Sequence, residues 1–362
     1  MSSVKIFCLT TSVARSSLSN CQRPAIVLVV LLLALVGCES KENSLRLSGS
    51  IFGTSWSLVY VPKDVSTDPS VIEAAVLEAF EVVDSTMNTY VPGTPLSRFN
   101  QMPVGQVIEM GWDFAYLVSE AQRITQLSGG AYDVTVGPLL DLWGFGPKGP
   151  TAYPSMEEVD AAKAIIGWSH IDWDPTNRLL SKRKPDVEIE LSSIAKGYAV
   201  DLGADALDEL GIENFLLEVG GEMQARGVSP RGDQWRVAIE RPDMARSGVQ
   251  AALSITDVGI ATSGDYRNYF EVDGIRYSHL IDPRTGYPIR HDLVSVTVLH
   301  PSTAIADAWA TAMAVMGTTA SIKLAEERNL AIYVIRRSGD TLSSQWSSEF
   351  GPYLEPSGGD RQ

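Results

Sequence analysis

Ala304-Ile305-Ala306-Asp307-Ala308-Trp309-Ala310-Thr311-Ala312-Met313-Ala314-Val315-Met316 is an apolar segment with only two polar side chains. A segment of this composition predicts a helix that is largely buried in the core. Asp307 and Thr311 are four residues apart, so the helix places their oxygens on one buried face. Oxygens at this spacing suit a hard cation such as Mg²⁺. A buried threonine can also bond to the preceding turn and a buried aspartate can cap a loop, so a structural role stays open for the pair alone.

A second polar segment, Ser278-His279-Leu280-Ile281-Asp282-Pro283-Arg284-Thr285-Gly286, comes shortly before this helix. Pro283 fixes φ at the second position of a tight turn and Gly286 permits the exit conformation, so the predicted turn is stiff. It holds His279 and Asp282 on its flanks. An unperturbed imidazole titrates near neutral pH and can accept a proton, which makes His279 a candidate general base. A lone histidine or a lone Asp-Pro turn is more often structural, but the two segments together indicate a site for chemistry.

The composition limits the class of protein. The chain has 362 residues, of which 20% are charged, and it can bury one large core or two modest ones. All three cysteines, Cys8, Cys21 and Cys38, lie in the first tenth of the chain. The rest of the sequence therefore has no thiol for a disulfide, a metal site or nucleophilic catalysis.

The N-terminal segment predicts export. Three basic side chains precede an acid-free apolar run over residues 25–36, which is short for a membrane span and suits a secretory signal. The run ends in Leu35-Val36-Gly37-Cys38, which resembles the lipobox of bacterial lipoproteins. We therefore expect a signal peptide over 1–37, a lipid (palmitate) anchor on Cys38 with a tether over 38–50, and a protein of the cell envelope that faces the periplasm at the inner membrane. A short anchor that stays attached is the alternative.

The charge of the chain argues against some partners. Removal of residues 1–37 takes away three basic and no acidic side chains, so the formal net charge changes from −15 to −18. Nucleic acids and anionic lipids bind basic surfaces, so we expect neither as an electrostatic partner.

Periodicity predicts both helices and strands. We expect a capping box at Ser155 and Glu158, because a hydroxyl followed three residues later by a glutamate satisfies two free N–H groups. The expected helices span 69–87, 112–127, 155 to about 167 and 192 to about 210, and the expected strands span 56–61, 187–191, 235–239, 252–255, 294–299 and 331–335. Without a regular βαβ rhythm, this order favours an α+β domain with a mixed sheet and packed helices over 51–350, followed by a flexible tail over 351–362.

Four further segments are short, rich in glycine and polar at one or two positions. They are Ser128-Gly129-Gly130-Ala131-Tyr132-Asp133, Glu190-Leu191-Ser192-Ser193-Ile194-Ala195-Lys196-Gly197, Glu218-Val219-Gly220-Gly221-Glu222 and Ala261-Thr262-Ser263-Gly264-Asp265-Tyr266. None is a Walker loop or a Rossmann fingerprint. In this order, and together with the two segments above, they resemble the ApbE family, the FAD:protein FMN transferases, many of which are periplasmic lipoproteins. The resemblance runs from Gly53-Thr54 to Thr311.

The resemblance implies a T-fold-related architecture, a reaction and a set of site residues. FAD binds with Mg²⁺, a Thr or Ser hydroxyl of a target flavoprotein attacks the pyrophosphate, FMN becomes phosphoester-linked and AMP leaves. The family's pattern places metal ligands at Ser193, Asp307 and Thr311, and catalytic groups at His279 and Asp282. It places flavin contacts at Phe52, Tyr90, Ala131, Tyr132, Asp133, Glu190, Lys196 and Ile281. The implied acceptor is a subunit of a membrane redox complex of the Na⁺-translocating NADH:quinone reductase or Rnf type.

Two other functions stay open at this point. One is an FAD pyrophosphatase that gives FMN and AMP, because water and threonine are similar nucleophiles. The other is a non-catalytic lipoprotein that binds flavin. The presence of His279, Asp282, Asp307 and Thr311 together argues against the second, because storage needs no base beside a metal.

Overall fold

The computed structural model describes residues 44–62, 67–146, 153–242, 248–265, 269–272, 275–339 and 341–356. The expected signal peptide, Cys38 and the first part of the tether lie outside these residues. In the part of the chain that is described, no helix combines the length and the apolar character that crossing a membrane requires.

An eight-stranded sheet is the centre of the fold, and all its neighbouring strands are antiparallel. In spatial order the strands are β1 (Leu45–Ile51), β2 (Thr54–Tyr60), β6 (Phe215–Val219), β7 (Glu222–Arg226), β10 (Val258–Gly264), β15 (Leu293–His300), β16 (Ala331–Ser338) and β17 (Thr341–Trp346). Phe52 and Gly53, both with positive φ, make the two-residue turn between β1 and β2, as the right-handed twist of a hairpin favours.

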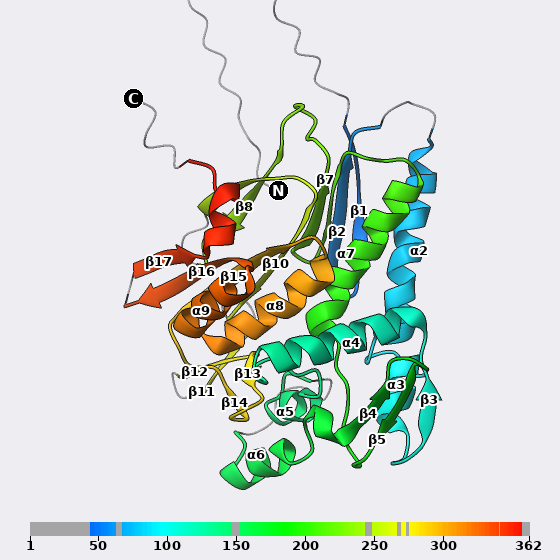
Figure 1. Ribbon diagram of the computed structural model, residues 1–362, viewed down its shortest axis with the longest axis vertical. Coiled ribbons are helices and arrows are strands. Elements are labelled where there is room, and N and C mark those ends of the chain that lie inside the picture. Colours follow the sequence, from blue (N-terminus) through cyan, green and yellow to red (C-terminus); the bar gives the residue numbers. More distant parts are fainter. Residues whose placement is uncertain are drawn as a thin grey trace, which may run out of the picture. The chain divides into compact units, whose positions relative to one another are not determined.

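Both faces of this sheet are buried at its central strands. Helices α2 (Pro69–Met87), α7 (Ser192–Glu209) and α8 (Thr303–Met316) pack on one face, and Figure 1 shows α2 beside α7. Side chains alternate along β15, where Val296 and Val298 join the helical core and Leu299 joins the core of the opposite face. A two-stranded ribbon, β8 (Trp235–Glu240) and β9 (Val249–Ile255), contributes to that opposite core together with the 3₁₀ helix η2 (Ser348–Tyr353).

Helices α7 and α8 approach each other very closely at Gly197. A Cβ at this position would lie 2.4 Å from the carbonyl oxygen of Thr303, so only glycine permits this contact. Four residues further along α7, the Asp201 carboxylate accepts hydrogen bonds from the backbone N–H groups of Thr303 (2.6 Å) and Ala304 (3.0 Å). Asp201 thereby satisfies two free donors at the start of α8 and fixes the two helices to each other.

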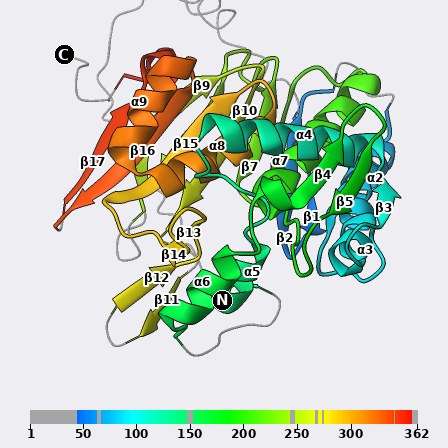
Figure 2. The same ribbon diagram turned by 60° about the horizontal axis from the view of Figure 1, so that its bottom comes forward.

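A smaller group of elements holds the polar turn. Helices α5 (Gly137–Leu142) and α6 (Met156–Lys163) share an aromatic cluster with β12 (Ile275–Ser278), β13 (Ile281–Asp282) and β14 (Tyr287–Pro288), and Figure 2 shows these elements together with β11 (Tyr269–Val272). The Trp143 indole donates a hydrogen bond to the Gly286 carbonyl at 2.9 Å, which ties α5 to the turn. The remaining elements are α3 (Pro95–Gln101), β3 (Val107–Glu109), α4 (Trp112–Leu127), η1 (Trp168–His170), β4 (Ile171–Asp174), β5 (Leu179–Lys182) and α9 (Thr318–Arg328).

The α+β class is confirmed, and the main sheet is antiparallel in every described pairing rather than mixed in strand direction. The helices expected over 69–87 and 112–127 have these bounds in the structure, and the capping box at Ser155 and Glu158 is present. The expected helix there is shorter, since α6 ends at Lys163. The part of the expected tail that is described, 351–356, is held to β9 by the Leu354 bridge to Leu253.

The expected strand over 187–191 is wrong. No described strand pairs with this segment, and its backbone groups bond elsewhere. The Asn100 amide bonds both the N–H and the carbonyl of Ile189, each at 2.9 Å, and the Glu190 N–H donates to the Val134 carbonyl at 2.7 Å. The Lys182 ammonium donates to the carbonyl of Val187 at 3.3 Å. The β-branched residues that predicted a strand are therefore buried in an extended segment without a ladder.

Candidate active site

A cavity of about 520 Å³ lies where the large sheet, α7, α8 and the polar turn meet. Ten of the residues expected in the site line it: Ala131, Tyr132, Asp133, Glu190, Ser193, Lys196, His279, Ile281, Asp307 and Thr311. They come from four separate segments of the chain. The fold therefore brings together most of the site that the sequence predicts, although their individual roles stay predictions.

Three expected residues do not line the cavity. Phe52 is at the tip of the β1–β2 hairpin and packs against Phe80, with ring centroids 6.2 Å apart. Tyr90 is 64% exposed. Asp282 forms a two-point ion pair with Arg284, in which Nε and Nη2 each lie 2.8 Å from a carboxylate oxygen. This ion pair stiffens the turn. Of the two neighbouring residues, Pro283 lines the cavity and Asp282 does not.

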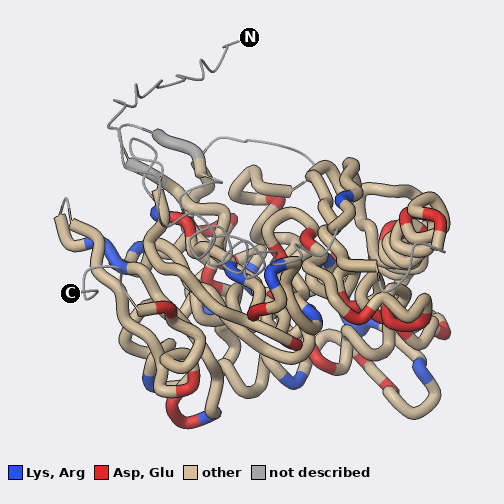
Figure 3. The backbone as a smooth tube through the Cα atoms, turned by 90° about the horizontal axis from the view of Figure 1, so that it is seen from above, with Lys and Arg blue, Asp and Glu red and all other residues tan. Residues whose placement is uncertain are grey.

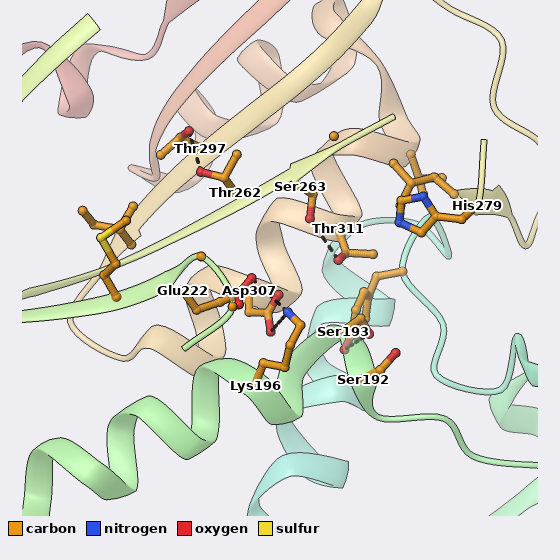
Figure 4. Close-up of a pocket in the computed structure, with 18 of the residues that line it drawn as sticks. Ser192, Ser193, Lys196, Glu222, Thr262, Ser263, His279, Thr297, Asp307 and Thr311 are labelled. Atoms are coloured by element: carbon orange, nitrogen blue, oxygen red, sulfur yellow. Dashed lines mark hydrogen bonds and ion pairs between the residues drawn. The ribbon is translucent and has the colours of Figure 1, made fainter. Parts of the chain in front are cut away.

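Lys196, Glu222 and Asp307 form the main charged group of the cavity, shown in Figure 4. The Lys196 ammonium lies 2.9 Å from Glu222 Oε1 and 3.7 Å from Asp307 Oδ2. Asp307 Oδ2 also accepts a hydrogen bond from the backbone N–H of Gly197 at 3.2 Å. Both carboxylates are almost fully buried, so two negative charges share one positive charge in a region of low polarisability.

The ionisation of this group follows from its burial. Burial raises the pKa of Glu222 to about 7, although the nearby Lys196 ammonium opposes that change. Burial also raises the pKa of Asp307, against the opposing effects of Lys196 and the Gly197 N–H. Burial alone would lower the pKa of Lys196, but the carboxylates of Asp307 and Glu222 outweigh it and raise the pKa. The lysine is therefore held protonated, and one carboxylate lacks a full counter-charge.

Negative charge dominates the lining. Figure 3 shows basic residues spread among acidic ones over many segments of the described chain. Among the described residues that line the cavity, Lys196 is the only Lys or Arg. Five carboxylates line it as well: Asp133, Glu190, Glu222, Glu240 and Asp307. A cavity of this composition favours a cation, and it repels an anionic ligand unless a cation accompanies it.

The start of α7 is organised by the side chain of Glu190, just before the helix, and by Tyr132 from another segment of the lining. The Glu190 carboxylate accepts from the backbone N–H of Ser192 at 2.9 Å and from its hydroxyl at 2.7 Å. The Ser193 hydroxyl donates to the phenol oxygen of Tyr132 at 3.1 Å. Glu190 therefore occupies an N–H donor that a helix start would otherwise offer to an anion.

Hydroxyl groups and the imidazole complete the site. The hydroxyls of Ser263 and Thr311 are 3.3 Å apart, and those of Thr262 and Thr297 are 2.8 Å apart. Figure 4 shows Thr311 between the charged group and His279, whose ring lies on the side of Thr311 away from Glu222. His279 and Lys196 thus both line the cavity, with Thr311 between them.

The donor set for a metal consists of oxygen atoms. Within the described ranges there is no cluster of three or more His, Cys, Asp or Glu side chains arranged for a metal ion. Asp307 is the only carboxylate among the expected ligands, with Ser193 and Thr311 beside it in the lining. This set fits Mg²⁺, which takes one or two carboxylates and fills its shell with water and substrate phosphate. The excess of negative charge in the lining supports the same fit.

Several lining residues were missed from the sequence. Glu222, Thr262 and Ser263 lie in glycine-rich segments whose pattern indicates no role for their side chains. Residues 237–240 of β8 line the cavity as well, and strand periodicity alone contains no signal for such a position.

The chain is similar to known proteins over most of its length. A family model described as the ApbE family matches residues 52–334. The FAD:protein FMN transferase of Vibrio cholerae serotype O1 is 41% identical over 330 residues, which cover 91% of this chain and 98% of that relative. The solved structure of Flavin Transferase ApbE from Vibrio cholerae has a TM-score of 0.80 at 39% identity and covers 86% of this chain and 99% of its own. Pseudomonas stutzeri flavinyl transferase ApbE, in its apo form, has a TM-score of 0.79 at 36% identity, covering 86% and 97%.

Proposed function

The chain belongs to the ApbE family, and we propose that it transfers FMN from FAD to a Thr or Ser hydroxyl of a target flavoprotein, with Mg²⁺ in the site and AMP as the leaving product. It is an FAD:protein FMN transferase by this membership. The observation that carries the detailed proposal is the lining itself, where Lys196, His279, Asp307 and Thr311 surround one cavity.

The charge balance supports a metal partner for FAD. The diphosphate of FAD is anionic, and the five carboxylates of the lining would repel it. Asp307 and Thr311 supply oxygen ligands that a bound Mg²⁺ could share with the diphosphate. Such an ion would neutralise charge on the phosphates, which is the main catalytic need in phosphoryl transfer.

The remaining chemistry falls to side chains of the chain. The acceptor oxygen forms a bond to the phosphorus of the FMN half, and the bond between that phosphorus and the bridging oxygen breaks, so that AMP leaves with this oxygen. His279 takes the proton from the acceptor hydroxyl. The Lys196 ammonium offsets charge on the phosphates. Tyr132, Asp133 and Glu190 supply an aromatic face and acceptors for flavin groups.

A transfer assay tests this function. We expect the purified full chain, given FAD, Mg²⁺ and a candidate acceptor, to produce flavin fluorescence on the acceptor band of a denaturing gel. An acceptor whose target hydroxyl is replaced by alanine is the control and should stay dark. Release of FMN and AMP with no labelled acceptor would instead identify an FAD pyrophosphatase, and FAD binding without turnover would identify a flavin-binding protein.

The site of action is a separate part of the proposal. The lipobox supports a lipid-anchored protein of the bacterial envelope that faces the periplasm at the inner membrane. This location suits an acceptor that is a subunit of a membrane redox complex, of the Na⁺-translocating NADH:quinone reductase or Rnf type. Both statements rest on the sequence, because Cys38 lies outside the described residues.

A substitution at Cys38 tests the anchor. We expect Cys38→Ser to block lipidation, so that the protein leaves the membrane fraction or stays unprocessed, because the sequence beyond the expected signal peptide contains no cysteine except Cys38. Fractionation and metabolic labelling with a palmitate analogue measure this. Cys8→Ser, which is within the expected signal peptide, is the matched control and should be labelled like the wild type. Unchanged labelling of Cys38→Ser would contradict the anchor.

A further inference from the structure

Glu222 is a buried acid that the proposed reaction leaves without a role. It opens β7, it is 4% exposed, and it lines the cavity. Oε1 pairs with the Lys196 ammonium, whereas Oε2 is buried with no hydrogen-bond partner among the described residues. Burial of a carboxylate with one unsatisfied oxygen costs free energy, so we expect Glu222 to have a function at this position.

The position of the lysine indicates that function. The Lys196 ammonium lies 2.9 Å from Glu222 Oε1, which is hydrogen-bond distance. It lies 3.7 Å from Asp307 Oδ2, which is too long for a hydrogen bond. We propose that Glu222 is a positioning residue that holds Lys196 away from Asp307 and thereby keeps the Asp307 carboxylate available to a divalent cation. This inference rests on the proposed function, in which Asp307 is the carboxylate that binds the metal.

The backbone that carries each carboxylate is held in place, and the lysine, with its long flexible stem, is the more mobile partner. Asp307 sits on α8, which Gly197 and Asp201 hold against α7. Glu222 follows a tight turn in which Gly220 and Gly221 have φ of 61° and 109°. The Gly220 N–H donates to the carbonyl of Ser55 at 3.0 Å. The position of the ammonium is therefore decided by the relative strength of its attraction to the Glu222 and Asp307 carboxylates.

Loss of the Glu222 charge should change that balance. An ammonium without its partner at Glu222 would move the short distance to Asp307, the other acid in reach. It would then compete with a divalent cation for the same carboxylate, because both are cations that seek the same oxygen atoms. The predicted effect is weaker metal binding that depends on the presence of Lys196.

Direct binding of Mn²⁺ to the purified full chain in detergent, without FAD or acceptor, measures this effect. The signal of free Mn²⁺ in electron paramagnetic resonance reports the bound fraction. We expect Glu222→Gln to raise the dissociation constant about tenfold, as is common when a buried charge loses its partner. The exposed Glu209→Gln, at the end of α7, is the matched control and should bind like the wild type.

A double-mutant cycle separates positioning from simple loss of charge. Lys196→Met should strengthen Mn²⁺ binding far more in the Glu222→Gln background than in the wild type, because only there does the lysine occupy Asp307. Equal effects of Lys196→Met in both backgrounds would overturn the inference, since they would mean that Glu222 acts only by its charge. Glu222→Asp keeps the charge, so its Mn²⁺ dissociation constant should stay within about threefold of the wild-type value. This variant provides the test if Glu222→Gln fails to fold. A tenfold loss in Glu222→Asp would also overturn the inference.

Asp307→Asn distinguishes this failure from failure of the proposed metal site. If Asp307→Asn binds Mn²⁺ as well as the wild type does, the metal site itself is wrong and the inference falls with it. If Asp307→Asn loses binding while the cycle shows no coupling, the metal site stands and only the role of Glu222 is rejected.

Discussion

Asp307→Ala should abolish FMN transfer and leave the protein folded. A metal at a phosphoryl-transfer site supplies several kcal/mol of transition-state stabilisation, so we expect a loss of at least about 10³-fold in rate. The fold should survive because the Asp307 carboxylate makes few contacts: a hydrogen bond of 3.2 Å from the Gly197 N–H, and an ion pair of 3.7 Å with the Lys196 ammonium, which would keep Glu222 as its partner. The rate of acceptor labelling and thermal unfolding measure the two parts.

Controls distinguish a metal ligand from a structural aspartate. Asp205→Asn removes an exposed carboxylate from α7 and should keep the wild-type rate. Chelation by EDTA should reproduce the loss in the wild type, and added Mg²⁺ should reverse it there but not in Asp307→Ala. A variant that unfolds, or a wild type that works unchanged in excess EDTA, would favour a structural role for this side of α8.

His279→Ala should lower the rate of transfer by about 10² to 10⁴-fold, the usual contribution of a general base. Affinity for FAD should change little, because a hydroxyl nucleophile needs a proton acceptor whereas flavin binding does not. Single-turnover labelling gives the rate, and quenching of flavin fluorescence gives the affinity. The exposed His291→Ala is the matched control and should resemble the wild type in both. Equal losses in rate and affinity would mean that the imidazole is a binding group, and Asp282 would then be the candidate general base.

The pH dependence gives a second test of His279. A general base must be neutral to accept a proton, so the rate should fall on acidification as the imidazole becomes charged. Glu222, whose pKa burial raises to about 7, titrates in the same range and adds its own change. The informative quantity is therefore the difference between the pH–rate profiles of the wild type and of His279→Ala. In His279→Ala the acid limb should become shallower, with only the contribution of Glu222 left, and an identical limb in both proteins would argue against the base.

Local pattern was enough for much of the helical structure. The apolar repeat over 69–87 and the capping box at Ser155 depend on neighbours three and four residues away, and these contacts exist within a single helix. The same logic placed Asp307 and Thr311 on one face of a buried helix. The motif order then identified ten of the residues that line the cavity.

The strand over 187–191 failed for a physical reason. Periodicity reports which side chains are buried, but a strand also needs a neighbour for its backbone. Asn100, which is 89 residues distant from Ile189 in the sequence, supplies those hydrogen bonds instead. Nothing within the segment itself could have revealed this partner.

The sequence by itself determined the buried helix with its two oxygens, the stiff turn that holds His279, and the family to which they are similar. Only the tertiary structure decided that Phe52 packs against Phe80 and that Glu222 meets Lys196. These two outcomes have one cause. Helices and turns follow from interactions between near neighbours, whereas the partner of a charged or aromatic side chain depends on which distant segments the packed core brings beside it.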